Sequence, residues 1–323
     1  MSDIFTQLQE NLGSGVKTAE PLAGYTNFKI GGPAKYFFVA QSTKELIKVI
    51  QVVDELKLPF IVLGGGTNVL VADAGFQGMV VIVKNNHLLI SGTKVMAEAG
   101  VNLGYLVQKT IDQGLTGFEP LVAVPGTVGG AVYGNAGLPQ TPRGFIGEWV
   151  KKVDVCRGDK LVRLSKEECN FGYRDSFFKH NNDIILSATF VLEKGNKEQS
   201  QELIKKYAEA RKNQPYNMPS PGCIFTNFKI TEAEEVKAKF KNEKNLDEFI
   251  ARGQVPASWL IDKAGLKSKT IGGAQVSEKH ANYIVNIGGA KAEDVVMLIS
   301  FIKQQVRDKF GIQLQEEVRY IGF

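Results

Sequence analysis

Apolar residues recur at spacings of three and four between residues 42 and 58, which predicts an amphipathic helix. Ser42 and Glu45 match a capping box at its start. The segment 102–114 predicts a second helix, with Asn102 as its N-cap and Gly114 at its end. A short helix is expected within residues 1–20, and others are expected at 198–212, 232–250, 257–264 and 292–311.

Short runs of β-branched and aromatic residues, bounded by glycine and proline, predict strands between these helices. TNFKIGGPAKYFFVA (26–40) predicts two strands around a Gly-Gly-Pro turn, and 59–71 predicts a strand, a glycine loop and a second strand. Helices and strands alternate irregularly, which favours a mixed α+β fold class with several subdomains. Further strands are expected at 79–84, 94–100, 150–165, 184–194, 283–289 and, as the closing strand, 312–322.

Composition and charge exclude several classes of protein. The chain has 323 residues, of which 43% are hydrophobic and 23% charged, as in globular proteins. Its formal net charge of +5 comes from basic residues spread along the chain. This pattern argues against a nucleic-acid partner and suits an anionic small molecule. No run approaches the roughly 18 apolar residues of a membrane span, and MSDIFTQLQE is polar, so we expect a cytoplasmic protein without a membrane partner.

The cysteines leave one question open. Cys156, Cys169 and Cys223 are widely spaced and odd in number, which argues against a disulfide framework. The chain has three histidines and no CxxC spacing, so no metal site is expected. For Cys223, within PSPGCIFTNF, two interpretations remain: an apolar residue that fills space, or a functional thiol.

Two glycine-rich runs are candidate phosphate-binding loops, LGGGTNVLV (63–71) and VPGTVGGAVYGNAG (124–137). Glycine lets backbone amides approach a phosphate closely. The first run fails the dinucleotide fingerprint because Val69 occupies the third glycine position, and no GKS or GKT follows for a P-loop. Each run is equally compatible with a tight turn or a close crossing of backbones.

Polar residues in three further segments are candidates for chemistry. Arg174 lies in NFGYRDSFFKH, where aromatic neighbours could hold it toward a carboxylate, although a surface ion pair is the common alternative. Strand alternation in QLQEEVRYIG does not distinguish Glu316 from Glu317. In SEKHANYIVN, Lys279, His280 and Asn282 could contact a phosphate or nucleobase, or form an ordinary polar loop.

Eight motifs, taken in order, resemble one family. TNFKIGGPA, LGGGTNVLV, PGTVGGAVYGNAG, FGYRDS, PSPGCIFTN, WLIDKAGLK, VSEKHANYIVN and LQEEVRYIG are similar to those of the UDP-N-acetylenolpyruvoylglucosamine reductases of peptidoglycan precursor synthesis. The resemblance implies an FAD-binding region of the vanillyl-alcohol-oxidase (PCMH) type, in two subdomains at 1–78 and 79–195. It also implies a C-terminal substrate-binding domain at 196–323, and NADPH as the reductant of the flavin.

The resemblance also assigns roles to residues. It maps the catalytic arginine and glutamate of the family onto Arg174 and Glu317, and its serine general acid onto Cys223. Hydride would pass from flavin N5 to the terminal methylene of the enol ether, and Cys223 would donate the proton, since a thiol with pKa near 8.5 is a stronger acid than a hydroxyl. The substrate UDP-N-acetylenolpyruvoylglucosamine would bind Tyr173, Lys212, Asn227 and His280. FAD would bind Gly64, Gly65, Gly66, Thr67, Asn68, Pro125, Gly126, Gly129, Gly130 and Asn135.

This chain departs from the family pattern in two places. The segment 138–149, LPQTPRGFIGEW, differs from the usual continuation after NAG. The chain has no room for the tyrosine-bearing loop that covers the substrate in some members, so Tyr216 is a candidate to shield the site. We expect a monomer. The rival interpretations are another flavin oxidase of sugars or hydroxy acids, and a nucleotide-binding protein without activity.

Overall fold

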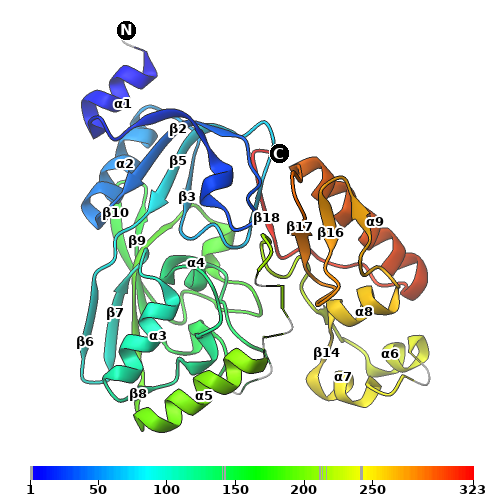
Figure 1. Cartoon of the computed structure of the whole chain (residues 1–323). Coiled ribbons are helices and arrows are strands. Elements are labelled where there is room, and N and C mark those ends of the chain that lie inside the picture. The colour runs from blue at the N-terminus through cyan, green and yellow to red at the C-terminus, as the bar shows by residue number, and fades with distance from the viewer. Residues whose placement is uncertain are drawn as a thin grey trace. The chain divides into compact units, whose positions relative to one another are not determined.

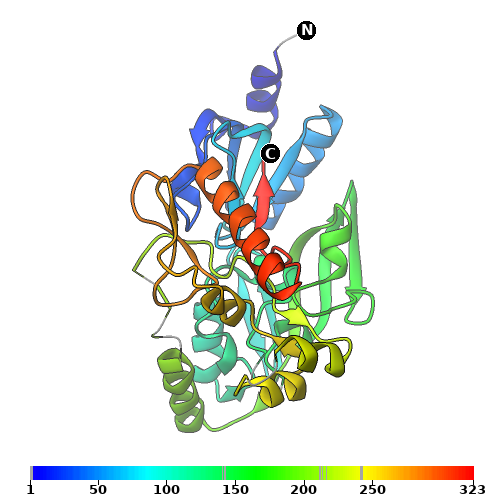
Figure 2. The same ribbon diagram turned by 90° about the vertical axis from the view of Figure 1, so that its right-hand side faces the viewer.

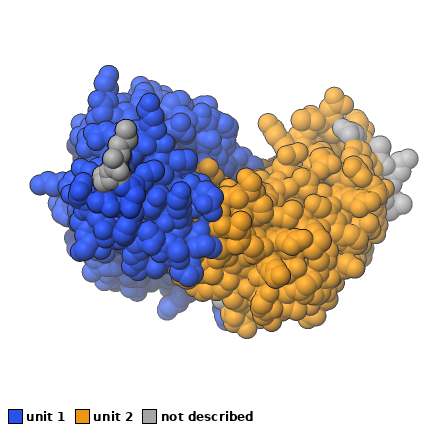
Figure 3. All heavy atoms as spheres, turned by 90° about the horizontal axis from the view of Figure 1, so that it is seen from above, with its two compact units in different colours: residues 1–21, 33–66, 76–212 blue, residues 22–32, 67–75, 213–323 orange. Residues whose placement is uncertain are grey.

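The computed structural model describes residues 3–139, 141, 143–210, 212, 214–215, 217–240 and 243–323 (Figure 1). The chain folds into two compact units, which Figure 3 distinguishes by colour. Unit 1 comprises residues 1–21, 33–66 and 76–212, and unit 2 comprises 22–32, 67–75 and 213–323. Two short N-terminal segments therefore belong with the C-terminal part of the chain.

The first sheet of unit 1 has four strands in the order β1-β2-β5-β3. β1 and β2 are antiparallel, whereas β5 is parallel to both β2 and β3. Helix α2 packs against β2 and β5 and buries Leu46, Val49, Ile50 and Val53. The strands are β1 (Lys17–Pro21), β2 (Pro33–Ala40), β3 (Phe60–Leu63) and β5 (Phe76–Val83), and the helices beside them are α1 (Ile4–Leu12) and α2 (Thr43–Glu55).

The second sheet of unit 1 has five strands in the order β10-β9-β11-β7-β6, and all its neighbours are antiparallel. Helix α4 (Val128–Tyr133) packs on its central strand β11. The strands are β6 (Leu88–Ser91), β7 (Lys94–Glu98), β9 (Val150–Arg157), β10 (Lys160–Ser165) and β11 (Ile184–Val191). The remaining elements are α3 (Leu103–Asp112), α5 (Lys197–Ala210), the pair β8 (Leu115–Thr116) and β12 (Glu193–Lys194), and the 3₁₀ turns η2 (Glu119–Leu121), η3 (Ile146–Glu148) and η4 (Phe177–His180).

Unit 2 is organised around helix α9 (Ala292–Phe310), which packs on a small antiparallel sheet (Figures 1 and 2). The carboxylate of Asp73 accepts the backbone amides of Ala292 and Glu293, and thereby caps α9. The sheets of this unit are β15 (Thr270–Ile271), β16 (Ala274–Val276) and β17 (Ile284–Asn286); β13 (Phe228–Lys229) with β14 (Gln254–Val255); and β4 (Val69–Val71) parallel to β18 (Arg319–Ile321). Its other helices are η1 (Leu22–Tyr25), α6 (Ala233–Lys239), α7 (Leu246–Arg252) and α8 (Ala257–Lys263).

Local signals located most elements correctly. Ser42 and Asn102 accept the backbone amides of Glu45 and Tyr105, as predicted for caps. The prediction of two strands in 26–40 was wrong, because only β2 forms there. The closing strand was predicted too long, since only Arg319–Ile321 forms a strand.

The predicted division at residues 78, 195 and 323 remains a prediction, and β5 runs across residue 78. No helix in the described part of the chain is long and apolar enough to cross a membrane.

Candidate active site

The two glycine-rich runs meet within unit 1. A Cβ added at Gly64 would lie 2.2 Å from Thr127 Oγ1. Only glycine at position 64 therefore allows the first run to approach the second this closely. Gly129 packs against Ala99, and its amide donates to the Ala99 carbonyl oxygen over 2.8 Å. Gly129 thus serves a close crossing of backbones, which was one of the alternatives that the sequence left open, whereas Gly64 makes room for the side chain of Thr127.

The same runs also place residues at the surface of unit 1. Gly65, Pro125 and Gly130 are exposed, and a Cβ at Gly130 would meet nothing closer than Thr127 Oγ1 at 3.7 Å. Gly126 has a φ of +121°, which L side chains rarely adopt. This arrangement fits a flat, phosphorylated cofactor lying against main chain, as FAD would.

Thr67 and Asn68, predicted as cofactor ligands, belong to unit 2, whereas Gly66 belongs to unit 1. Asn68 Nδ2 donates to the carbonyl oxygen of Glu317 over 3.1 Å, and the Arg319 amide donates to the Asn68 carbonyl oxygen over 3.1 Å. The side chain of Asn68 therefore holds the backbone of the predicted catalytic glutamate.

Asn135, also predicted to bind FAD, is buried in unit 1 and bridges two loops. Its Nδ2 donates to the carbonyl oxygen of Gly172 over 2.7 Å, and its Oδ1 accepts the amide of Gly147 over 3.0 Å. Both the donor and the acceptor of the Asn135 side-chain amide thus have backbone partners within the protein.

Arg174 lies in a tight turn that Asn135 supports. Gly172 and Asp175 exchange backbone hydrogen bonds of 3.0 and 3.3 Å across this turn, and Arg174 has a φ of +54°. Its guanidinium carbon lies 5.9 Å from the ring centre of Phe145 and 6.0 Å from that of Tyr173. The two rings meet edge to face at 6.0 Å, so the arginine side chain is held by aromatic faces.

Phe145 was not predicted as a site residue. It belongs to the segment 138–149, whose departure from the family pattern left its contacts unspecified. An aromatic residue in that segment was the available signal, but only the fold brings Phe145 to Arg174.

Cys223 is half-buried in unit 2, next to two backbone pairings. It forms an antiparallel bridge with Tyr283, and the following residue, Ile224, donates its amide to the Asn282 carbonyl oxygen over 2.8 Å. The Ile224 carbonyl oxygen accepts the amide of Glu317 over 2.7 Å. The fold therefore brings the predicted proton donor and the predicted glutamate onto adjacent backbone segments.

The neighbouring carboxylate, Glu316, has other partners. Its Oε1 lies 2.6 Å from Lys303 Nζ in a partly buried ion pair. Burial, and then a hydrogen bond to Glu316, raise the pKa of Tyr320 well above its usual range. Glu316 thus anchors the C-terminal segment, which distinguishes it from Glu317 where strand alternation did not.

Comparison with known proteins identifies the family of this chain. A family model described as UDP-N-acetylenolpyruvoylglucosamine reductase, C-terminal domain, matches residues 214–321, and one described as FAD binding domain matches 34–164. A curated UDP-N-acetylenolpyruvoylglucosamine reductase from Caldanaerobacter subterraneus subsp. tengcongensis is 37% identical over 305 residues, covering 94% of this chain and 92% of the relative. The chain belongs to the UDP-N-acetylenolpyruvoylglucosamine reductase family. A second relative of that name, from Carboxydothermus hydrogenoformans, is 38% identical over 98% of this chain and 97% of its own length.

A solved structure of a UDP-N-acetylenolpyruvylglucosamine reductase from Thermus caldophilus matches with a TM-score of 0.74 and 30% identity, covering 95% of this chain and 98% of that one. The predicted α+β class, with an N-terminal FAD-binding region and a C-terminal domain, is confirmed. The prediction of an FAD-dependent oxidoreductase is confirmed as well.

The residues predicted to bind substrate differ in their burial and in their partners. His280 is half-buried and lies edge to face with Tyr283, with ring centres 4.9 Å apart. The Asn227 side chain hydrogen-bonds to Gln254 and to the Ala257 amide at the start of α8. Lys212 is exposed and pairs with Glu209. Tyr216 lies outside the described residues, so its predicted shielding role has no structural description.

The other two cysteines are core residues. Cys156 and Cys169 are 1% and 0% exposed. Burial raises the pKa of Cys169 from its ordinary value of 9.0 to about 12, and burial also raises the pKa of Cys156. Both thiols are therefore poor nucleophiles near neutral pH. Within the described ranges, no three His, Cys, Asp or Glu side chains gather into a potential metal site.

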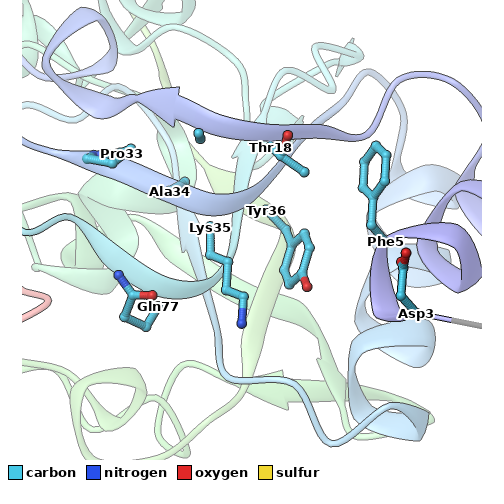
Figure 4. A pocket seen from close by; sticks show the side chains of 9 residues that line it. Asp3, Phe5, Thr18, Pro33, Ala34, Lys35, Tyr36 and Gln77 are labelled. Atoms are coloured by element: carbon cyan, nitrogen blue, oxygen red, sulfur yellow. The ribbon is translucent and has the colours of Figure 1, made fainter.

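An open pocket of about 470 Å³ lies elsewhere on unit 1 (Figure 4). Residues of α1, β1, β2 and β5 line it, among them Phe5, Thr18, Lys35 and Tyr36. None of its lining residues is a predicted site residue, so the pocket does not change the assignment of the active site.

Proposed function

We propose that this chain catalyses the NADPH-dependent reduction of the enolpyruvyl ether of UDP-N-acetylglucosamine to UDP-N-acetylmuramate, a step of peptidoglycan precursor synthesis. NADPH contributes one hydrogen and two electrons as hydride, and solvent supplies the second hydrogen as a proton through Cys223. Bound FAD supplies hydride-transfer chemistry toward the terminal methylene carbon of the enol ether. The exposed residues Gly65, Pro125 and Gly130 would hold FAD.

The single observation that carries this proposal is the 2.7 Å hydrogen bond between the Glu317 amide and the Ile224 carbonyl oxygen. It supports a shared site for Cys223 and Glu317, which lie far apart in the sequence. Cys223 would protonate the ether carbon, next to the carbon that accepts hydride. Its half-buried position suits this role, because a proton donor must contact the substrate and then recover a proton from solvent.

Arg174 and Glu317 would stabilise the negative charge that develops on the substrate. After hydride addition this charge spreads from the ether carbon into the adjacent carboxylate as an enolate. A guanidinium held by Phe145 and Tyr173 is preorganised for such a charge. Glu317 would act as a protonated carboxyl or through hydrogen bonds, since a second negative charge would oppose the enolate.

The proposal also includes four residues that would bind the substrate outside its reacting carbons. The exposed ammonium of Lys212 suits a diphosphate. Tyr173 and His280 offer aromatic surfaces with a polar group. Asn227 is the weakest of the four, because its amide already binds Gln254 and Ala257.

An anaerobic two-step absorbance experiment tests the function. NADPH is added to the purified flavoprotein until the flavin bleaches, and enolpyruvyl-UDP-N-acetylglucosamine is then added. We expect rapid return of the oxidised spectrum and one equivalent of UDP-N-acetylmuramate. UDP-N-acetylglucosamine, which lacks the enol ether, is the matched control and should leave the flavin reduced. Bleaching without recovery by the enol ether would contradict the proposed substrate.

A further inference from the structure

Asn282 makes a two-sided contact with the backbone of Phe225, two residues after Cys223. Its Oδ1 accepts the Phe225 amide over 3.0 Å, and its Nδ2 donates to the Phe225 carbonyl oxygen over 2.8 Å. The Asn282 carbonyl oxygen also accepts the amide of Ile224 over 2.8 Å. One residue therefore binds three polar backbone groups of this segment.

The contact lies in the interior of unit 2. Asn282 is 3% exposed, and the two residues that it holds, Ile224 and Phe225, are 0% and 1% exposed. Both the donor and the acceptor of this buried amide are paired, and leaving either one unpaired would cost free energy. The contact therefore favours one orientation of the Asn282 side chain relative to the Phe225 backbone. The side chain thus hydrogen-bonds to both polar backbone groups of Phe225, as a neighbouring β-strand would.

The segment that Asn282 holds also binds the predicted glutamate. The Ile224 carbonyl oxygen accepts the Glu317 amide, and Phe225 forms an isolated antiparallel bridge with Glu316. On the other side, Cys223 is bridged to Tyr283, the residue after Asn282. Asn282 is therefore the connection between the segment of Cys223, the segment of Glu317 and the loop before β17.

We propose that Asn282 is a positioning residue that sets the placement of the Cys223 thiol relative to Glu317. It does so through the backbone of Phe225, without contacting the substrate. This replaces the phosphate or nucleobase contact considered from the sequence, because both hydrogen-bonding groups of its amide bind Phe225. The catalytic meaning of this positioning rests on the proposed function, whereas the positioning itself does not.

Alkylation of Cys223 by iodoacetamide, measured by mass spectrometry on the purified protein, tests the positioning without substrate. Cys156 and Cys169 are buried and serve as internal references. We expect Asn282→Ala to change the alkylation rate of Cys223 by roughly fivefold or more, because the released segment opens locally. Asn286→Ala is the matched control. This asparagine also binds three backbone groups of unit 2, at Phe28, Gly288 and Ala290, and its loss should change the rate by less than about twofold.

Asn282→Asp provides a second test should the alanine variant fail to fold. Aspartate keeps an acceptor for the Phe225 amide, but its ionised form cannot donate to the Phe225 carbonyl oxygen. Lowering the pH protonates the carboxyl, whose pKa burial raises, and restores a donor. The ratio of alkylation rates between variant and parent should therefore return toward one as the pH falls.

Equal effects of Asn282→Ala and Asn286→Ala, or a ratio for Asn282→Asp that does not vary with pH, would overturn the positioning role. Half-reaction kinetics then separate this inference from the proposed function. If Asn282→Ala alters alkylation of Cys223 while the reduced flavin is reoxidised by substrate at the parent rate, Asn282 positions the thiol but Cys223 is not the proton donor.

Discussion

The side-chain amide of Asn135 donates a 2.7 Å hydrogen bond to the carbonyl oxygen of Gly172, the first residue of the turn that carries Arg174. The same amide accepts the backbone N–H of Gly147. A residue predicted to contact FAD is therefore the support of the predicted catalytic arginine. This relationship has a measurable consequence for the protein without cofactor.

Asn135→Gly should lower the free energy of unfolding of the apoprotein by about 1–3 kcal/mol, because the buried amide of Gly147 loses its acceptor and the Gly172 carbonyl oxygen loses one of its two donors. Glycine tolerates the φ of +42° at this position, so backbone strain does not contribute. Asn170→Gly is the control, since Asn170 is exposed and has the same φ. Urea unfolding measures both variants. A loss of FAD affinity with parent-like stability of the apoprotein would instead support the cofactor contact.

Cys223→Ser should retain much of the activity, whereas Cys223→Ala should slow product formation by about 100-fold or more, the usual contribution of a general acid. Reduction of the flavin by NADPH should proceed at the parent rate in both variants, because the proton is needed only in the second half-reaction. Stopped-flow absorbance separates the two steps. Product formation at the parent rate by Cys223→Ala would refute the donor role.

Phe145→Leu should reduce the rate of reoxidation by substrate several-fold, since a cation–π contact contributes about 0.5–2 kcal/mol. The change keeps an apolar side chain and removes the aromatic face beside Arg174. Phe177→Leu is the matched control, because its ring lies 5.9 Å from the guanidinium carbon of Arg157, which is not a predicted site residue. Steady-state kinetics with the enol ether as substrate compare the two variants. Equal losses of rate in both would argue against a specific role of Phe145.

Glu317→Gln should change the rate of the reaction, whereas Glu316→Gln should change the stability of the fold. Glu317→Gln should slow the second half-reaction by about 10-fold or more, through weaker stabilisation of the enolate. Glu316→Gln breaks the ion pair with Lys303, so it should lower the free energy of unfolding by about 1 kcal/mol. Its rate of product formation should stay near that of the parent. If Glu316→Gln were the slower enzyme, the assignment of the catalytic glutamate would be reversed.

The buried thiol of Cys169 should make the protein less stable in alkali. Its pKa is raised from 9.0 to about 12 in the folded protein. Between these values the unfolded chain loses the proton and the folded chain keeps it, so the free energy of unfolding falls with rising pH, by up to about 1.4 kcal/mol per unit. Well below pH 9.0 both states keep the proton, so this thiol causes no pH dependence there.

Cys169→Ala removes this contribution, although the substitution also costs some packing at every pH. The difference in unfolding free energy between parent and variant should therefore shrink as the pH rises from about 9 to 12. Urea titrations over this range measure the difference. A difference that stays constant with pH would show that the thiol ionises equally in both states.

The sequence by itself determined the elements whose signals are local. Helices α2 and α3 begin at their predicted caps, because a cap and an apolar stripe act within one or two turns. It also determined the family, since ordered motifs along the chain specify it without any contact between them. The roles of single polar residues could not be determined in this way.

Only the tertiary structure decided what Asn68, Asn135 and Asn282 bind. Their side chains meet backbone groups 249, 37 and 57 residues away in the chain. An asparagine amide suits a ligand and a carbonyl oxygen equally well, so its residue type does not reveal the partner.

The tertiary structure also decided the length of the closing strand, where alternation predicted a long one. Pairing with residues 224–226, and the ion pair of Glu316 with Lys303, leave only Arg319–Ile321 as a strand. Long-range contacts decide these positions because they satisfy buried polar groups that no local pattern encodes.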